Sequence, residues 1–258
     1  MRLCLYLGHH AGITRSAVHW LLRSALLVIF ANIAPAHAEN IGQNLARCQD
    51  QAVPPKQRHA ACSSLIDDKT LDVGARVEAL LNRGMMHEGI GESTDALADY
   101  TTAAELDPDN ELAFFNRGNV YEGLGQFEEA IRNYDRAIEL NAHDADFFNN
   151  RGRAWESLGK IEKAMADFGS AIHIDPKHGS AYVNRALSLA DTGEHATAIK
   201  DFDKAISLGV DDPEVWAARG GVNEALGRAE AARHDFAKTI AANPSHERAL
   251  EGLARLQK

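Results

Sequence analysis

A 34-residue period is the sequence feature that most restricts how this chain can fold. The tripeptide Asn-Arg-Gly occurs three times at that spacing, beginning at Asn82, Asn116 and Asn150, and recurs in weaker form at Asn184 and Ala218. Five consecutive blocks keep one register without an insertion or deletion, and they begin at Val77, Glu111, Ala145, Gly179 and Pro213. A period kept so strictly indicates stacked units, each of which presents the same face to the next.

Within each block, the spacing of large and small residues predicts two helices joined by a tight turn. Positions 4, 8 and 11 of a block share one helical face. Position 8 is small, which lets a second helix approach closely: Gly84, Gly118, Gly152, Ala186 and Gly220. Position 15 is glycine throughout: Gly91, Gly125, Gly159, Gly193 and Gly227. Glycine accepts the left-handed conformation that ends a helix, so the first helix should stop there. A second apolar stripe has an aromatic residue at position 24: Tyr100, Tyr134, Phe168, Phe202 and Phe236.

This arrangement resembles the tetratricopeptide repeat (TPR) family, which has a 34-residue unit and the same preferences at positions 4, 8, 11, 20, 24, 27 and 32. The resemblance covers residues 77–246 and implies an all-α fold, a right-handed superhelical solenoid of stacked antiparallel hairpins. Position 11 departs from the pattern at His87 and Asn223. We expect five repeats at 77–110, 111–144, 145–178, 179–212 and 213–246. A degenerate helical hairpin at 39–76 would precede them, and a charged capping helix at 247–258 would follow.

The first 38 residues predict a secretory signal. They contain Arg2, Arg15 and Arg23 without an acidic residue, then an apolar run at 24–34 and an A-x-A site that ends at Ala38. Cleavage there would export the mature chain, and we expect it in a bacterial periplasm. The alternative is an uncleaved membrane anchor, which is disfavoured because the apolar run is well short of the ~20 residues that cross a bilayer.

The charge and cysteine content of the mature chain restrict its partners and its compartment. Cleavage of the leader would remove three of the 27 basic residues and none of the 37 acidic ones. The mature chain would then have 24 basic and 37 acidic residues. Such an acidic chain repels phosphate, so nucleic acid and anionic membrane surfaces are poor candidate partners. We also expect no stable membrane insertion of the mature chain. Cys48 and Cys62 would remain, and in an exported chain we expect them to form a disulfide that staples the N-terminal hairpin. Two buried free thiols are the alternative.

No motif for catalysis is present. His87-Glu88 begins like the helix of a zinc protease, but Gly91 stands where the second histidine should be. No nucleophile, base and orienting group occur together, so we expect no enzyme, no cofactor and no metal site.

Position 7 is arginine in every block, and position 23 is acidic in four of the five. The arginines are Arg83, Arg117, Arg151, Arg185 and Arg219, and the acids are Asp99, Asp167, Asp201 and Asp235, with Asn133 as the exception. One interpretation is a row of arginines for an anionic ligand. We favour a structural pair that bridges helices, because the two positions recur together and a desolvated guanidinium requires a bidentate acid.

Positions 2, 5, 9 and 12 form another stripe on the first helix, and they differ from block to block. In the family that this chain resembles, they line a concave groove that binds an extended peptide or a partner helix. Together with the asparagines at position 6, whose amides can bond a peptide backbone, they give the candidate binding residues. These are Leu81, Asn82, Met85, Glu88, Phe115, Asn116, Asn119, Glu122, Asn149, Asn150, Arg153, Glu156, Asn184 and Leu187.

Glutamates at position 12 make the predicted groove acidic, which favours a neutral to basic ligand, although they can instead be simple solvated surface. The sequence therefore predicts a non-catalytic protein–protein scaffold or adaptor of the cell envelope. The alternative is an accessory or regulatory subunit that docks on an envelope enzyme or export complex.

Overall fold

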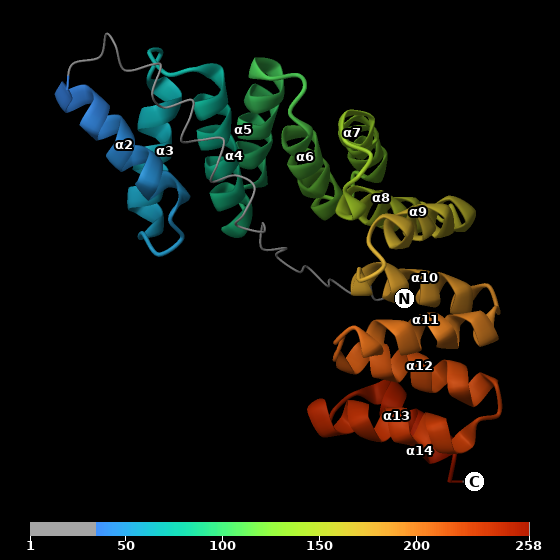
Figure 1. Ribbon diagram of the computed structural model, residues 1–258. Coiled ribbons are helices and arrows are strands. Elements are labelled where there is room, and N and C mark those ends of the chain that lie inside the picture. The colour runs from blue at the N-terminus through green and yellow to red at the C-terminus, as the bar shows by residue number, and fades with distance from the viewer. Residues whose placement is uncertain (1–34, 258) are drawn as a thin grey trace. The chain divides into compact units, whose positions relative to one another are not determined.

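The computed structural model describes residues 35–257, which divide into two compact units at residues 35–120 and 121–257. Every regular element in this range is an α-helix, as the repeat pattern predicted (Figure 1). Most of the predicted signal, including its apolar run, lies outside the described residues. Of the helices within them, none has the length and apolar character that a membrane crossing requires.

The first unit contains two antiparallel hairpins and the start of a third. Its helices are α2 (Pro35–Gln49), α3 (Pro55–Asp67), α4 (Val73–Gly89) and α5 (Ser93–Leu106), and α6 (Glu111–Gly123) begins in this unit and ends in the next. Helix α2 packs against α3, α3 against α4, and α4 against α5. Helix α2 runs through the predicted cleavage point after Ala38, which falls in its first turn.

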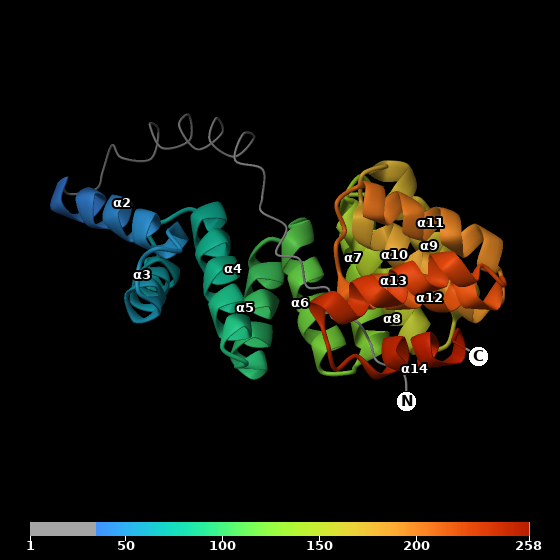
Figure 2. The ribbon, with the colours of Figure 1, turned by 90° about the horizontal axis from the view of Figure 1, so that it is seen from below.

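The second unit continues the same alternation. Its helices are α7 (Phe127–Leu140), α8 (Ala145–Ser157), α9 (Ile161–Ile174), α10 (Gly179–Asp191), α11 (His195–Ser207), α12 (Pro213–Ala225), α13 (Ala229–Ala242) and α14 (Glu247–Arg255). Neighbours in sequence are neighbours in space from α7 to α14 (Figure 2). Short helices that pack on the helices of adjacent hairpins make a solenoid, so the predicted all-α fold is confirmed.

Glycine ends the first helix of every repeat, as predicted. The five glycines at position 15 have φ between 71° and 85°: Gly91, Gly125, Gly159, Gly193 and Gly227. A side chain is strained at such a φ, whereas glycine is not. The chain therefore reverses at the same position in each hairpin and keeps the 34-residue register.

Close contact within a hairpin depends on the small residue at position 8. A Cβ added at Gly152 would lie 2.6 Å from Cε1 of Phe168 and 3.2 Å from the backbone oxygen of Ala164. Gly84 faces Tyr100 and Gly220 faces Phe236 in the same way. The aromatic residue at position 24 thus lies directly on the backbone of the opposite helix.

We expect Gly152→Ala to lower the free energy of unfolding by about 1–3 kcal/mol, because the added methyl group overpacks a filled core. Gly221→Ala is the matched control, since nothing lies within 4 Å of the Cβ that it would add on helix α12. Alanine favours a helix by up to ~1 kcal/mol over glycine, so this control should be stabilised. Urea denaturation measures both, and equal effects of the two substitutions would contradict the steric argument.

The N-terminal hairpin is closed by the predicted disulfide. Cys48 and Cys62 are bonded, with their Cα atoms 5.0 Å apart. Both are fully buried and pack with Ile41, Leu65 and Ala79, so the bond joins α2 and α3 in a core that also reaches α4.

At the other end of the chain, α14 covers the last repeat. Gly252 of α14 lies against the ring of Phe236, and Leu253 and Leu256 pack against the cluster that contains this ring. Leu250 is 46% exposed. The capping helix thus buries one narrow apolar stripe.

Candidate protein-binding face

Arginines at position 7 hold the hairpins together. Four of them make bidentate bonds of 2.6–2.9 Å to the aspartate at position 23 of the same hairpin: Arg83–Asp99, Arg151–Asp167, Arg185–Asp201 and Arg219–Asp235. The four aspartates are buried. Hydrogen bonding to Asp99 raises the pKa of Arg83, and hydrogen bonding to Asp201 raises that of Arg185, so both guanidinium groups stay charged. The predicted pairing is confirmed.

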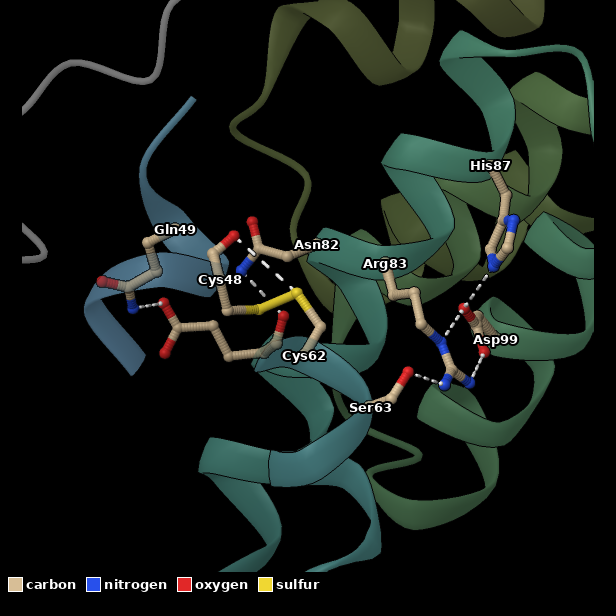
Figure 3. Close-up of a disulfide and its surroundings, with 9 residues drawn as sticks. Cys48, Gln49, Cys62, Ser63, Asn82, Arg83, His87 and Asp99 are labelled. Carbon is tan, nitrogen blue, oxygen red and sulfur yellow. Dashed lines mark hydrogen bonds and ion pairs between the residues drawn. A yellow bond between two sulfur atoms is a disulfide. The ribbon is translucent and has the colours of Figure 1, made fainter. Parts of the chain in front are cut away.

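The third nitrogen of these arginines extends the bridge to the preceding hairpin. Arg151 Nη1 donates to Asp135 at 2.7 Å, and Arg219 Nη1 donates to Asp203 at 2.6 Å. In the first repeat, Arg83 Nη1 donates to Ser63 of α3 at 2.8 Å (Figure 3). Each such arginine therefore joins three helices. This structural role accounts for the recurrence of arginine at position 7 without an anionic ligand.

In the second unit, the first helices of successive hairpins form one face. Helix α8 contacts α10, and α10 contacts α12. Across the first of these contacts, Asn184 Nδ2 donates to Asn149 Oδ1 at 2.9 Å, and Ser188 Oγ donates to Glu156 Oε1 at 2.8 Å. The predicted binding positions of this unit therefore lie together, but several of them are hydrogen-bonded to one another.

Glutamates at position 12 have partners inside the protein. In the first two repeats, the partner is the tyrosine at position 24 of the same hairpin. The Tyr100 hydroxyl donates to Glu88 at 3.0 Å, and the Tyr134 hydroxyl donates to Glu122 at 2.8 Å. Burial, together with the Glu88 charge, raises the pKa of Tyr100, so this hydroxyl keeps its proton.

Where position 24 is phenylalanine, the glutamate finds a partner in the next helix of the face. Glu156 accepts from Ser188, and Glu224 accepts two bonds from Arg255 of α14, at 2.8 and 2.9 Å. The bond from Arg255 lowers the pKa of Glu224. The change from tyrosine to phenylalanine was visible in the sequence, but only the fold shows which donors replace the hydroxyl.

Glu122 is a largely enclosed carboxylate. Its side chain is 12% exposed and pairs with Arg153 Nη2 at 2.9 Å. Burial raises the pKa of Glu122, and the Arg153 charge and the Tyr134 hydrogen bond oppose that shift. The charge that was predicted to face a ligand is therefore largely neutralised within the protein.

The first unit presents a more apolar face. On α4, Leu81 is 9% exposed and Met85 is 43% exposed, and on α6 Leu112 is 39% exposed. Phe115 is half-buried. The Asn82 amide donates to the backbone oxygen of Glu78, one turn earlier. Large apolar side chains thus occur at the predicted positions of this unit, and some of them are exposed.

Helix α2 covers the start of this face. Gln49 Nε2 donates to Glu78 Oε1 at 2.7 Å, which joins α2 to position 2 of the first repeat (Figure 3). Burial raises the pKa of Glu78, and the Gln49 bond opposes that shift. Gln49 could not be identified from the sequence, because no local pattern relates it to a residue 29 positions away.

The remaining predicted binding residues are half-buried or buried. Asn149 is buried and donates to the Asn150 side chain at 3.2 Å, in addition to accepting from Asn184. The half-buried ones are Asn116, Asn119 and Leu187.

Models of the tetratricopeptide repeat match four segments of the chain. They cover residues 90–125, 112–144, 145–178 and 183–247. The chain belongs to the tetratricopeptide repeat family. TPR arrays are interaction modules that present a stacked surface to other proteins. This chain is accordingly a non-catalytic protein–protein interaction scaffold.

Solved structures of other TPR proteins share the fold. YrrB, described as a TPR protein with an unusual peptide-binding site, is 21% identical with a TM-score of 0.61, and the match covers 76% of this chain and 99% of YrrB. PilF of Pseudomonas aeruginosa is 16% identical with a TM-score of 0.73, over 85% and 97% of the two chains. MamA is 22% identical with a TM-score of 0.57, over 65% and 92%. No curated protein sequence matches the chain significantly.

Proposed function

We propose that this TPR protein is an exported adaptor of the bacterial cell envelope, which binds a peptide or partner helix along the face of its first helices. The observation that carries the proposal is that two large apolar side chains of the first unit, Met85 on α4 and Leu112 on α6, are exposed at positions of the predicted binding stripe. Exposed large apolar side chains are typical of an interaction site when they form a patch. The predicted leader and the Cys48–Cys62 disulfide support an oxidising, exported environment.

The contacts of the glutamates refine the proposed ligand. Glu122 is paired with Arg153, and Glu224 is paired with Arg255, so the first helices of the second unit carry less free negative charge than their composition suggests. Within the neutral to basic range that the sequence favours, these contacts support a neutral segment with apolar anchors. Ionic steering would then contribute little, and binding would depend weakly on salt.

Affinity capture from an envelope extract tests this proposal. We expect the chain to capture one protein, and Met85→Ser with Leu112→Ser to weaken its binding at least tenfold, because each lost apolar contact removes about 1–2 kcal/mol. The matched control is Ile90→Ser with Leu124→Ser, since both residues are exposed and apolar but lie where the first helices of their repeats end. Equal capture by both double variants would contradict the proposal. Identification of the captured protein as an envelope enzyme would favour an accessory subunit over an adaptor.

A further inference from the structure

A histidine and two carboxylates converge where α4 turns into α5. His87 lies in the last turn of α4, Glu92 directly precedes α5, and Asp95 lies in the first turn of α5. One ligand atom from each lies within 4.8 Å of the others. The turn at Gly91 brings the two helix ends together, so residues of two elements form one cluster.

Both ring nitrogens of His87 face carboxylate oxygens. Nδ1 lies 2.7 Å from Oε2 of Glu92, and Nε2 lies 3.9 Å from Oδ2 of Asp99 (Figure 3 shows His87 directed toward Asp99). Asp99 is fixed by its two bonds from Arg83. At 2.7 Å, the contact between Nδ1 and Glu92 is a hydrogen bond, which has one proton between the two groups. A metal ion bound between them would take the place of this proton and leave the imidazole proton on Nε2, the nitrogen that faces Asp99.

The other repeats show that the fold does not require this combination. Positions 11, 16 and 19 are Tyr121, Gln126 and Glu129 in the second repeat, and Trp155, Lys160 and Lys163 in the third. In the third repeat, Lys163 Nζ lies 4.1 Å from the centre of the Trp155 ring, so the same place carries positive charge. The later repeats have Leu189, Glu194 and Thr197, and then Asn223, Arg228 and Ala231. Only the first repeat places an imidazole with two acids at these positions.

We propose that His87, Glu92 and Asp95 bind one divalent transition-metal ion, with water in the remaining positions. One imidazole nitrogen and two carboxylate oxygens suit Zn²⁺ and its neighbours, which imidazole ligands prefer over Mg²⁺ or Ca²⁺. Ligands around a tetrahedral zinc lie about 3.3 Å apart. Glu92 and Asp95 are exposed, so their side chains are free to rotate to that spacing. The bound ion would tie α4 to α5 and stabilise the first repeat.

Isothermal titration of the purified, untagged full-length chain with ZnCl₂ tests this site. We expect one equivalent to bind with a dissociation constant in the micromolar range, and MgCl₂ to give no comparable binding. Glu92→Gln with Asp95→Asn should weaken zinc binding at least tenfold and should remove the zinc-dependent rise in melting temperature. His87→Gln should have the same effect.

The controls separate this site from general surface binding. Glu128→Gln with Glu129→Gln removes two acids from the first turn of α7, the corresponding helix of the second repeat, and should leave zinc binding unchanged. The Glu92 and Asp95 substitutions are at exposed positions, so they test the site even if His87→Gln disturbs folding. Absence of a one-to-one site would overturn the proposal, and so would unchanged binding by the Glu92 and Asp95 variant, because His87–Glu92 would then be an ordinary ion pair.

Discussion

Asp167→Ala is expected to lower the free energy of unfolding by about 3 kcal/mol. The substitution removes both bonds between Asp167 and Arg151 and leaves a half-buried guanidinium without its buried partner. Loss of one member of a buried pair typically costs about 3–5 kcal/mol, and we expect the lower end because Arg151 keeps its bond to Asp135. Urea denaturation followed by circular dichroism measures the change.

Asp135→Ala is the matched control, because it removes the other partner of the same arginine. The Asp135 side chain is 46% exposed, whereas that of Asp167 is 8% exposed. An exposed ion pair contributes less than about 1 kcal/mol to the free energy of unfolding. The control should therefore unfold at a urea concentration close to the midpoint of the unsubstituted protein. An equal loss in the two variants would show that burial does not decide the strength of this bridge.

Removal of the Cys48–Cys62 bond should have an effect of similar size, confined to the start of the chain. The bond closes a loop of 14 residues in sequence separation, and the loss of such a crosslink costs ~3 kcal/mol in the chain-entropy model. We expect Cys48→Ser with Cys62→Ser to expose the amides of α2 and α3 to hydrogen exchange. The amides of residues 145–257 should keep their protection, because repeats contact only their neighbours.

Reduction provides the control for the disulfide prediction. A reducing agent should destabilise the native chain to the level of the double serine variant and should leave that variant unchanged. Thiol titration of the denatured, unreduced protein should find neither Cys48 nor Cys62 free. Two free thiols, or unchanged hydrogen exchange in the variant, would contradict the prediction.

The repeat architecture could be read from the sequence because its determinants are local and occur five times. A helix stop needs a residue that accepts positive φ, and glycine stands at that position in every block, as at Gly91 and Gly227. The pairing of Arg151 with Asp167 was also predictable, because both positions recur 16 residues apart in most blocks. Repetition separates these signals from chance.

The candidate binding face could be predicted only in outline. The sequence placed Glu122 and Arg153 in the same stripe, but their pairing across two repeats depends on how far apart the stacked helices lie. Tertiary structure also decided that Met85 is exposed whereas Asn149 is buried, since exposure depends on what the neighbouring helix covers.

The sequence by itself determined the helical elements of the repeats, their order and where the first helix of each repeat ends, because these depend on local periodicity and on glycine. Only the tertiary structure decided which polar groups satisfy one another. His87, Glu92 and Asp95 give no recognised motif in the sequence, yet the turn between α4 and α5 brings them together. Gln49 reaches Glu78 only because the hairpins stack. Contacts of this kind depend on distances between helices, which no local pattern specifies.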